Sequence, residues 1–304
     1  MKILVVELVG CNLAYLGCYG NEWVATPNLD RLAAEGIVFD QHFSGSPAAR
    51  FEPATHRTID AIDDLPDVAA ELCEESTGVV WIAGPRLSPP WDPDACITDY
   101  AEDNERIPWF GPTNRLTLDD LPSVADTYAG AMTYFDAQLG NLLDAFEDSE
   151  WTIVVTASMG LAIEELALGG PGIGEESVHL PLIVRFADRR HAGERMSALT
   201  QPSDLVATLR SWLELPADST LGRDLMPLVR GEIESLRPSV VSVQGESAAL
   251  RTPEWALLRA AESASRLFVK PDDRWEVNDV AQHHREVVEA LEAELAKREA
   301  GDTP

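Results

Sequence analysis

The chain has 304 residues, of which 45% are hydrophobic, enough for one large α/β domain or two unequal domains. Its formal net charge of −29 repels anions, so we expect neither nucleic acid nor an anionic membrane as a partner. No apolar stretch reaches the roughly 18 residues of a membrane span. Glu7 interrupts the apolar run that a signal peptide would need, so we expect a cytoplasmic location.

The first fifty residues read as a strand, a loop, a short helix and a second strand. Residues 3–9 form a near-continuous apolar run, which is typical of a strand buried on both faces of a parallel sheet. In the helix that follows, Thr26 suits the N-cap position, Pro27 the first turn and Gly36 the C′ position. Residues 37–39 begin the second strand.

The middle of the chain alternates between helices and buried strands. Apolar spacing predicts a helix around residues 68–73, and an apolar run predicts a strand at 78–83. A proline-rich loop at 85–93 and an acidic, irregular stretch at 100–120 follow. Apolar residues spaced by threes and fours then predict a long helix over 124–146, which leads into a buried strand at 151–156.

The last part of the chain changes character. A helix is expected from residue 201 to about residue 215. Short strands separated by turn residues are then expected at 240–243, 248–251, 255–259 and 266–269, before a closing helix at 283–298.

Several stretches carry a resemblance to a known family. LGCYGN at 16–21 and TPNLDRLAAEGIVFD at 26–40 resemble the N-terminal signature of the sulfatases, within the alkaline phosphatase superfamily. YFDAQLGNLLDAF at 134–146, the run at 175–186 and RWEVNDVA at 274–281 resemble later parts of the family. Residues 51–120 match poorly and are short for the family, and their role stays open.

The resemblance implies an α/β fold. We expect residues 1–235 to form a mostly parallel central sheet flanked by helices, and residues 236–304 to form a small antiparallel α+β subdomain with a closing helix.

A sulfatase makes its nucleophile by oxidising a Cys or Ser in a motif that ends in arginine. Residues 46–50, SPAAR, fit the loose form of this motif, which puts Ser46 at the nucleophile position and Arg50 at the orienting arginine. The usual Cys is absent, and Ala48 replaces the usual Pro. The alternative interpretation is a polar turn without catalytic function.

The family also holds a divalent cation between two clusters of ligands. The aspartates expected after the first strand are replaced by Val9 and Gly10, and Glu7 is a weak candidate because it is two residues early on the same face. Ser158 and Met159 occupy the later pair of ligand positions. A serine and a thioether are poor substitutes for the hard oxygen ligands of calcium or magnesium, so we expect no metal cofactor.

The remaining candidate groups point to structure rather than chemistry. The four cysteines form no CxxC pair, and Cys11 and Cys18 in the first loop are expected to be small core residues. His179 is expected to be structural. The basic residues that the family places after the second ligand pair are missing, because residues 161–174 contain no Lys, Arg or His.

Three functions remain open. The first is a sulfatase-like protein that has lost the metal site and catalytic residues and acts as a non-catalytic binding or partner protein, for an unknown small molecule or protein. The second is an active sulfuric-ester or phosphate-ester hydrolase with a rebuilt site around Ser46 and Arg50. The third is a metal-independent enzyme of another kind on the same scaffold, because fold does not fix function.

Overall fold

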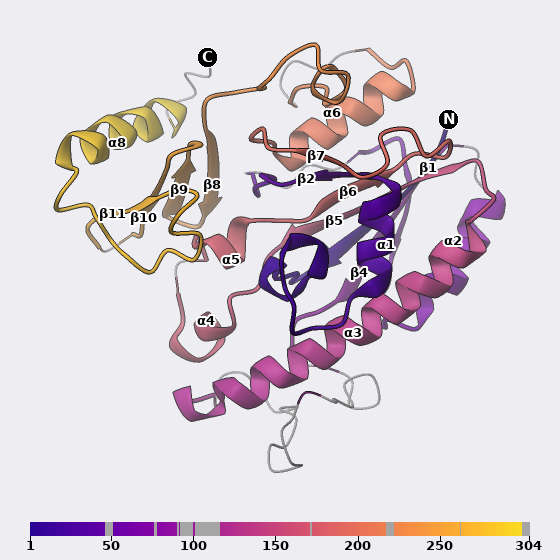
Figure 1. Cartoon of the computed structure of the whole chain (residues 1–304), viewed down its shortest axis with the longest axis horizontal. Coiled ribbons are helices and arrows are strands. Elements are labelled where there is room, and N and C mark those ends of the chain that lie inside the picture. The colour runs from indigo at the N-terminus through magenta and orange to yellow at the C-terminus, as the bar shows by residue number, and fades with distance from the viewer. Residues whose placement is uncertain are drawn as a thin grey trace. The chain divides into compact units, whose positions relative to one another are not determined.

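The computed structural model describes residues 1–45, 51–75, 78–89, 91, 100, 116–170, 172–216, 222–261 and 263–299. The chain divides into two compact units, and each is drawn in Figure 1. The first unit comprises residues 1–40, 51–170 and 180–196, and the second comprises residues 41–50, 171–179 and 197–304. The expected single boundary between residues 235 and 236 stays a prediction.

A seven-stranded sheet forms the centre of the first unit (Figure 1). Among these strands only β6 runs against the others, because it pairs antiparallel with both β5 and β2. The spatial order is β3 (Thr55–Thr58), β4 (Val79–Arg86), β1 (Lys2–Val9), β5 (Trp151–Met159), β6 (Leu182–Arg185), β2 (Ile37–Phe39) and β7 (Glu194–Met196). The predicted mostly parallel central sheet is therefore confirmed.

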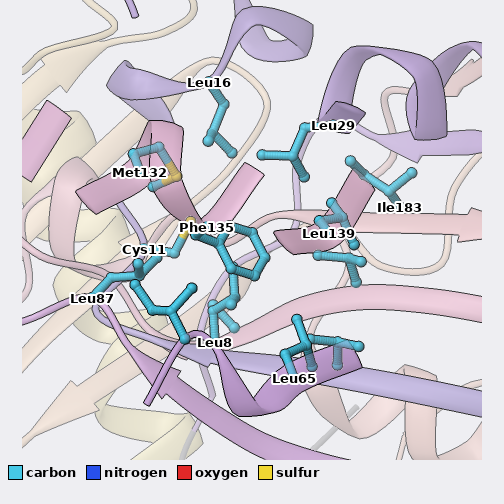
Figure 2. Packing of buried hydrophobic residues seen from close by; sticks show 14 of the residues in the cluster. Leu8, Cys11, Leu16, Leu29, Leu65, Leu87, Met132, Phe135, Leu139 and Ile183 are labelled. Atoms are coloured by element: carbon cyan, nitrogen blue, oxygen red, sulfur yellow. The ribbon is translucent and has the colours of Figure 1, made fainter. Parts of the chain in front are cut away.

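Helices of the first unit pack on this sheet through one apolar cluster, part of which is shown in Figure 2. The helices are α1 (Pro27–Glu35), α2 (Asp64–Glu75), α3 (Leu121–Ala145) and α4 (Ile163–Leu168), and single 3-10 turns lie at Leu13–Tyr15, Gly17–Tyr19 and Leu118–Asp120. Leu8 of β1, Leu65 of α2, and Phe135 and Leu139 of α3 are almost completely buried in it. Truncating such a side chain to alanine costs about 2–5 kcal/mol, so this cluster fixes the helices to the sheet.

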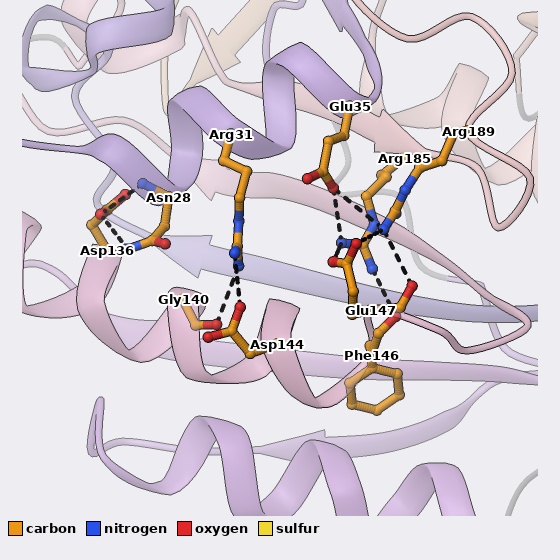
Figure 3. A network of polar contacts seen from close by, with 10 residues as sticks. All are labelled: Asn28, Arg31, Glu35, Asp136, Gly140, Asp144, Phe146, Glu147, Arg185 and Arg189. Carbon is orange, nitrogen blue, oxygen red and sulfur yellow. Dashed lines mark hydrogen bonds and ion pairs between the residues drawn. The ribbon is translucent and has the colours of Figure 1, made fainter.

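The start of α1 is stabilised by a residue far away in the sequence (Figure 3). Pro27 occupies the first turn as expected, but the Thr26 side chain makes no cap hydrogen bond to the helix and instead accepts one from Gly17 N at 2.9 Å. The buried carboxylate of Asp136 on α3 accepts hydrogen bonds from the backbone N–H groups of Asn28 at 3.0 Å and Leu29 at 2.7 Å. Asp136 therefore accepts the capping hydrogen bonds that were predicted for Thr26.

The end of α1 also differs from the expectation. Gly36 ends the helix in an extended conformation, with φ −132° and ψ −164°, not in the left-handed conformation usual at C′. A Cβ at this position would lie 2.5 Å from the carbonyl oxygen of Val184 on β6. The glycine is therefore needed for close approach to the sheet.

A buried arginine joins the sheet to the end of α3 (Figure 3). Arg185 of β6 is fully buried, pairs with Glu35 at 3.2 Å and donates to the carbonyl of Phe146 at 3.1 Å. Arg189 pairs with Glu35 at 3.4 Å and with Glu147 at 3.1 Å. These contacts compensate the buried guanidinium, which would otherwise be costly.

The second unit holds a four-stranded antiparallel sheet and four helices in its described part. The strands, in spatial order, are β11 (Arg266–Val269), β10 (Trp255–Arg259), β9 (Ser247–Arg251) and β8 (Val240–Gln244). The helices are α5 (Glu175–Val178), α6 (Pro202–Trp212), α7 (Met226–Val229) and α8 (Arg285–Glu299). Leu291 and Leu295 of α8 share an apolar cluster with Leu250 and Leu257 of the sheet, as expected for a closing helix.

Two stretches show what the sequence pattern did not reveal. The edge strand β3 was not predicted, because its four residues are all exposed and carry no apolar alternation. The strand β4 continues to Arg86 into the expected proline-rich loop, and residues 101–115 of the acidic stretch lie outside the described residues. Within the described ranges, no helix combines the length and apolar character that crossing a membrane requires.

Candidate functional site

The carboxyl ends of β1, β4 and β5 meet at one edge of the central sheet. Val9 at the end of β1 pairs in register with Arg86 of β4 and with Met159 of β5. Ligands bind preferentially at this edge of a mostly parallel sheet. The structure therefore brings together two positions, Val9 and Met159, at which the family resemblance expects metal ligands.

Backbone hydrogen bonds hold this edge together. The N–H groups of Gly10 and Cys11 both donate to the carbonyl of Met159, each at 3.1 Å. The hydroxyl of Ser158 donates to the carbonyl of Leu8 at 3.2 Å. The Met159 side chain is 46% exposed, so a thioether rather than a carboxylate faces solvent here.

Glu7 lies two residues deeper in β1 than Val9. It pairs in register with Ala83 of β4 and Thr156 of β5, and its Oε2 accepts a hydrogen bond from the indole N–H of Trp81 at 2.9 Å. This contact gives the carboxylate a partner in the sheet. A role for Glu7 as a metal ligand stays a prediction.

The predicted nucleophile Ser46 and arginine Arg50 lie outside the described residues. Their roles therefore stay predictions.

The donor set at this edge does not fit a calcium or magnesium ion. Such ions take six or more oxygen ligands, mainly carboxylates and carbonyls. Val9 and Met159 supply none from their side chains, and Ser158 already donates its hydroxyl proton within the sheet. In the described ranges, no three His, Cys, Asp or Glu side chains form a group that could hold a metal ion.

Arg86 is a candidate that the sequence interpretation missed. It was assigned to the proline-rich loop, but it is the last residue of β4 and is exposed beside Val9. Among the described residues no carboxylate forms an ion pair with it, in a chain that carries 52 acidic side chains. A guanidinium at the carboxyl edge can bind an oxyanion through two parallel N–H···O hydrogen bonds.

The loop after β1 is held by a second group that the sequence did not reveal. Tyr128 of α3 donates its hydroxyl proton to the carbonyl of Gly10 at 2.9 Å and accepts from Asn12 N at 2.7 Å. The Asn12 amide donates to the carbonyl of Leu161 at 2.9 Å. The side chains of Tyr128 and Asn12 are both buried, so this loop is fixed relative to α3.

The cysteines do not look like nucleophiles. Burial raises the pKa of the Cys11 thiol far above its usual range, and burial raises the pKa of Cys18 and of Cys73 to about 12. A thiol attacks as the thiolate, so these groups are poorly reactive near neutral pH. Cys96 lies outside the described residues.

His179 belongs to a buried charge cluster in the second unit. Its ring stacks on Phe43 with centroids 4.5 Å apart, and its Nδ1 lies 2.8 Å from Glu175. Glu175 also pairs with Lys270 at 2.9 Å, and Lys270 pairs with Glu276 at 3.3 Å. Burial alone would raise the pKa of Glu175, but the hydrogen bond and charge of His179 and the charge of Lys270 lower it to about 2. His179 thus contacts both an aromatic ring and a carboxylate, and its structural role stays a prediction.

Comparison with known proteins agrees with this architecture. The family model described as Sulfatase matches residues 83–215. This stretch of the chain is therefore similar to the sulfatases. The matched region covers less than half of the 304 residues and includes α3, β5 and β6.

Curated proteins match this chain over a short stretch. Steryl-sulfatase of Mus musculus is 56% identical and that of Homo sapiens 55% identical, each over 46 residues or 15% of this chain. The match covers 7% of the mouse protein and 8% of the human protein. The match is therefore a local similarity to steryl-sulfatases, and it says nothing about a substrate of this chain.

Solved structures show the fold along nearly the whole chain. A phosphonate monoester hydrolase of Agrobacterium radiobacter is 15% identical with a TM-score of 0.76, and the match covers 99% of this chain and 96% of that one. A protein solved with its substrate D-glucosamine-2-N,6-O-disulfate is 14% identical with a TM-score of 0.73, covering 99% and 98%. At such low identity the likeness shows the fold alone.

Proposed function

We propose that this chain is a sulfatase-like protein that has lost the metal site and the catalytic residues and acts as a non-catalytic binding or partner protein. One observation carries the proposal: Val9 and Met159, at two expected ligand positions, pair with each other at the carboxyl edge of the sheet. An isopropyl group and a thioether stand where hard oxygen ligands are needed.

The chemistry of sulfate esters explains why these positions matter. Cleavage builds negative charge on the oxygens around sulfur, and a divalent cation stabilises that charge by several kcal/mol. In a chain with a net charge of −29, a bound anion meets additional repulsion. Without the expected ligands, the edge offers Arg86 as an exposed cation next to Val9. A single exposed guanidinium favours binding of an anion more than its chemical conversion.

The alternative is an active sulfuric-ester or phosphate-ester hydrolase with a rebuilt site around Ser46 and Arg50. The position of Arg86 favours it, because a basic group at the carboxyl edge would balance part of the charge on a leaving anion. Glu7 would be the first carboxylate to test as a ligand in that case.

The deciding experiment combines metal content with turnover. Protein purified without chelator is analysed by elemental mass spectrometry and assayed with 4-nitrophenyl sulfate, 4-nitrophenyl phosphate and a phenylphosphonate monoester. We expect no stoichiometric calcium or magnesium and no turnover above that of the Ser46→Ala variant. Turnover that Ser46→Ala abolishes, while the neighbouring control Ser44→Ala retains it, would refute the proposal and establish the hydrolase.

A gain-of-ligand variant sharpens the test. Val9→Asp, Ser158→Asp and Met159→Asn are combined to restore oxygen ligands at the paired positions. We expect this variant to retain about one calcium or magnesium per chain. If it binds no metal although its fold is intact, the side chains at these positions are not what keeps the ion away, and the argument fails.

A further inference from the structure

Three aromatic side chains form a continuous strip beside the loop that follows β1. The ring of Trp23 lies 6.0 Å from that of Tyr15 and 5.3 Å from that of Tyr100, tilted by 57° and 70°. Trp23 is 50% exposed, whereas most large apolar side chains of the first unit are buried. We name Tyr15, Trp23 and Tyr100 the aromatic strip.

The strip contacts α3 and the loop that follows β1. Tyr15 packs edge-on against Tyr128, with ring centroids 4.7 Å apart, and Tyr128 binds the carbonyl of Gly10. The hydroxyl of Tyr100 lies 2.6 Å from the hydroxyl of Thr133 on α3 and accepts a hydrogen bond from Ala25 N at 2.9 Å. Both ends of the strip are thus fixed.

The exposed tryptophan is held by its own loop. The side-chain oxygen of Asn21 accepts hydrogen bonds from the backbone N–H of Trp23 at 2.8 Å and of Val24 at 2.6 Å. Val24 is buried, which anchors the chain directly after Trp23. The outward face of Trp23 is therefore preformed, and a ligand that stacks on it loses little free energy to ordering the loop.

Two other tryptophans of this chain have a cationic side chain over the indole ring. The guanidinium of Arg274 lies 4.7 Å from the ring of Trp275, and the ammonium of Lys2 lies 5.9 Å from the ring of Trp151. Over the part of the chain that the structure describes, no lysine or arginine lies over Trp23 in this way. Trp23 is thus a half-exposed ring over which no described residue places a cation, unlike Trp151 and Trp275.

The charge around the strip favours a cation as well. The whole chain carries a net charge of −29. Glu22, directly before Trp23, is exposed and forms no ion pair with any residue that the structure describes. Negative potential and the electron-rich face of an indole both attract a cation, and both disfavour an anion.

We propose that the aromatic strip binds an alkylammonium group of a small-molecule ligand through the exposed part of the Trp23 ring. The flat ring supplies a cation–π contact, and the methyl or methylene groups around the nitrogen pack against the same indole ring. Such a contact contributes about 0.5–1 kcal/mol at an exposed ring and about 2 kcal/mol where water is excluded. The inference does not rest on the proposed function, because none of these residues belongs to the sheet edge discussed there.

The test compares two probes of the same shape and different charge. Tetramethylammonium chloride and tert-butyl alcohol are titrated into the full chain at constant ionic strength, and the indole N–H signals are followed by NMR. We expect tetramethylammonium to shift the Trp23 signal saturably, and to bind at least about three-fold more tightly than tert-butyl alcohol. Equal binding of the two probes would overturn the proposal, since only apolar contact would then remain.

Matched variants identify the ring. Trp23→Leu keeps an apolar side chain but removes the π face, and we expect it to weaken tetramethylammonium binding about five-fold. Trp275→Leu is the control, because Trp275 is 46% exposed but already carries Arg274. If Trp23→Leu is not folded by circular dichroism, Trp23→Met replaces it, because methionine also removes the aromatic ring. Equal effects of the Trp23 and Trp275 variants would overturn the proposal.

Discussion

The stability of α1 should depend on Asp136, which lies 108 residues from Asn28 in the sequence. Its carboxylate accepts three hydrogen bonds at the helix start, from Asn28 N and Asn28 Nδ2 at 3.0 Å each and from Leu29 N at 2.7 Å. Asp136→Ala leaves these donors without their partner. An unsatisfied buried donor costs about 1–3 kcal/mol, so we expect the free energy of unfolding to fall by about 3 kcal/mol.

The isosteric variant should cost less. Burial raises the pKa of Asp136, with the N–H groups of Asn28 and Leu29 opposing the rise, so desolvation of the charge outweighs these hydrogen bonds. Asp136→Asn removes the charge and keeps one oxygen acceptor for Leu29 N. We therefore expect a loss of about 1 kcal/mol, roughly a third of the alanine effect.

Urea unfolding followed by circular dichroism measures the two losses, and hydrogen exchange of the α1 amides shows whether they arise at that helix. Asp144→Ala is the control on the same helix α3. Asp144 pairs with Arg31 at 2.7 Å, but its side chain is 70% exposed, so its loss should cost at most about 1 kcal/mol. If Asp136→Ala costs no more than Asp144→Ala, the carboxylate does not cap α1 as described.

Three further predictions concern other parts of the chain. Because the pKa of Glu175 is lowered to about 2, with His179 among the causes, Glu175→Gln should lose about 3 kcal/mol of unfolding free energy at pH 7. Urea titrations should show this difference shrinking as pH falls from about 4.5 towards 2. Gly84→Ala should destabilise by at least about 2 kcal/mol in the same assay, because Gly84 has φ +109° and a Cβ there would lie 2.0 Å from the carbonyl oxygen of Ile59. Cys11 should resist iodoacetamide at pH 8 in the folded chain and react after unfolding, as peptide mass spectrometry can show.

Elements with a long apolar pattern could be predicted from the sequence. The helix expected at 124–146 is α3 (Leu121–Ala145), and the strand expected at 151–156 is β5 (Trp151–Met159). In both, burial of one continuous apolar surface dictates the conformation. The exposed strand β3 lacks that signal, and it forms because β4 supplies its hydrogen-bond partners.

Residues that depend on distant partners could be recognised only in part. Gly36 was noticed as a helix stop, but its requirement comes from the carbonyl of Val184 on β6. Thr26 was expected to cap α1, whereas Asp136 from α3 does so. In each case the residue type predicted where the helix boundary lies. The physical reason for that boundary is a contact that forms only in the folded chain.

At the candidate site the backbone pairing does not depend on the side chains that would carry the chemistry. The pairing of Val9 with Met159 uses backbone atoms, since Gly10 N and Cys11 N donate to the Met159 carbonyl whatever side chains are present. The side chains at the ligand positions can therefore change without loss of the sheet. The sequence similarity to sulfatases, which the core residues carry, then remains. By the same reasoning, an aspartate at Val9 and an asparagine at the 46% exposed Met159 should be tolerated by the fold. If the gain-of-ligand variant failed to bind metal, a disrupted sheet would therefore not be the explanation.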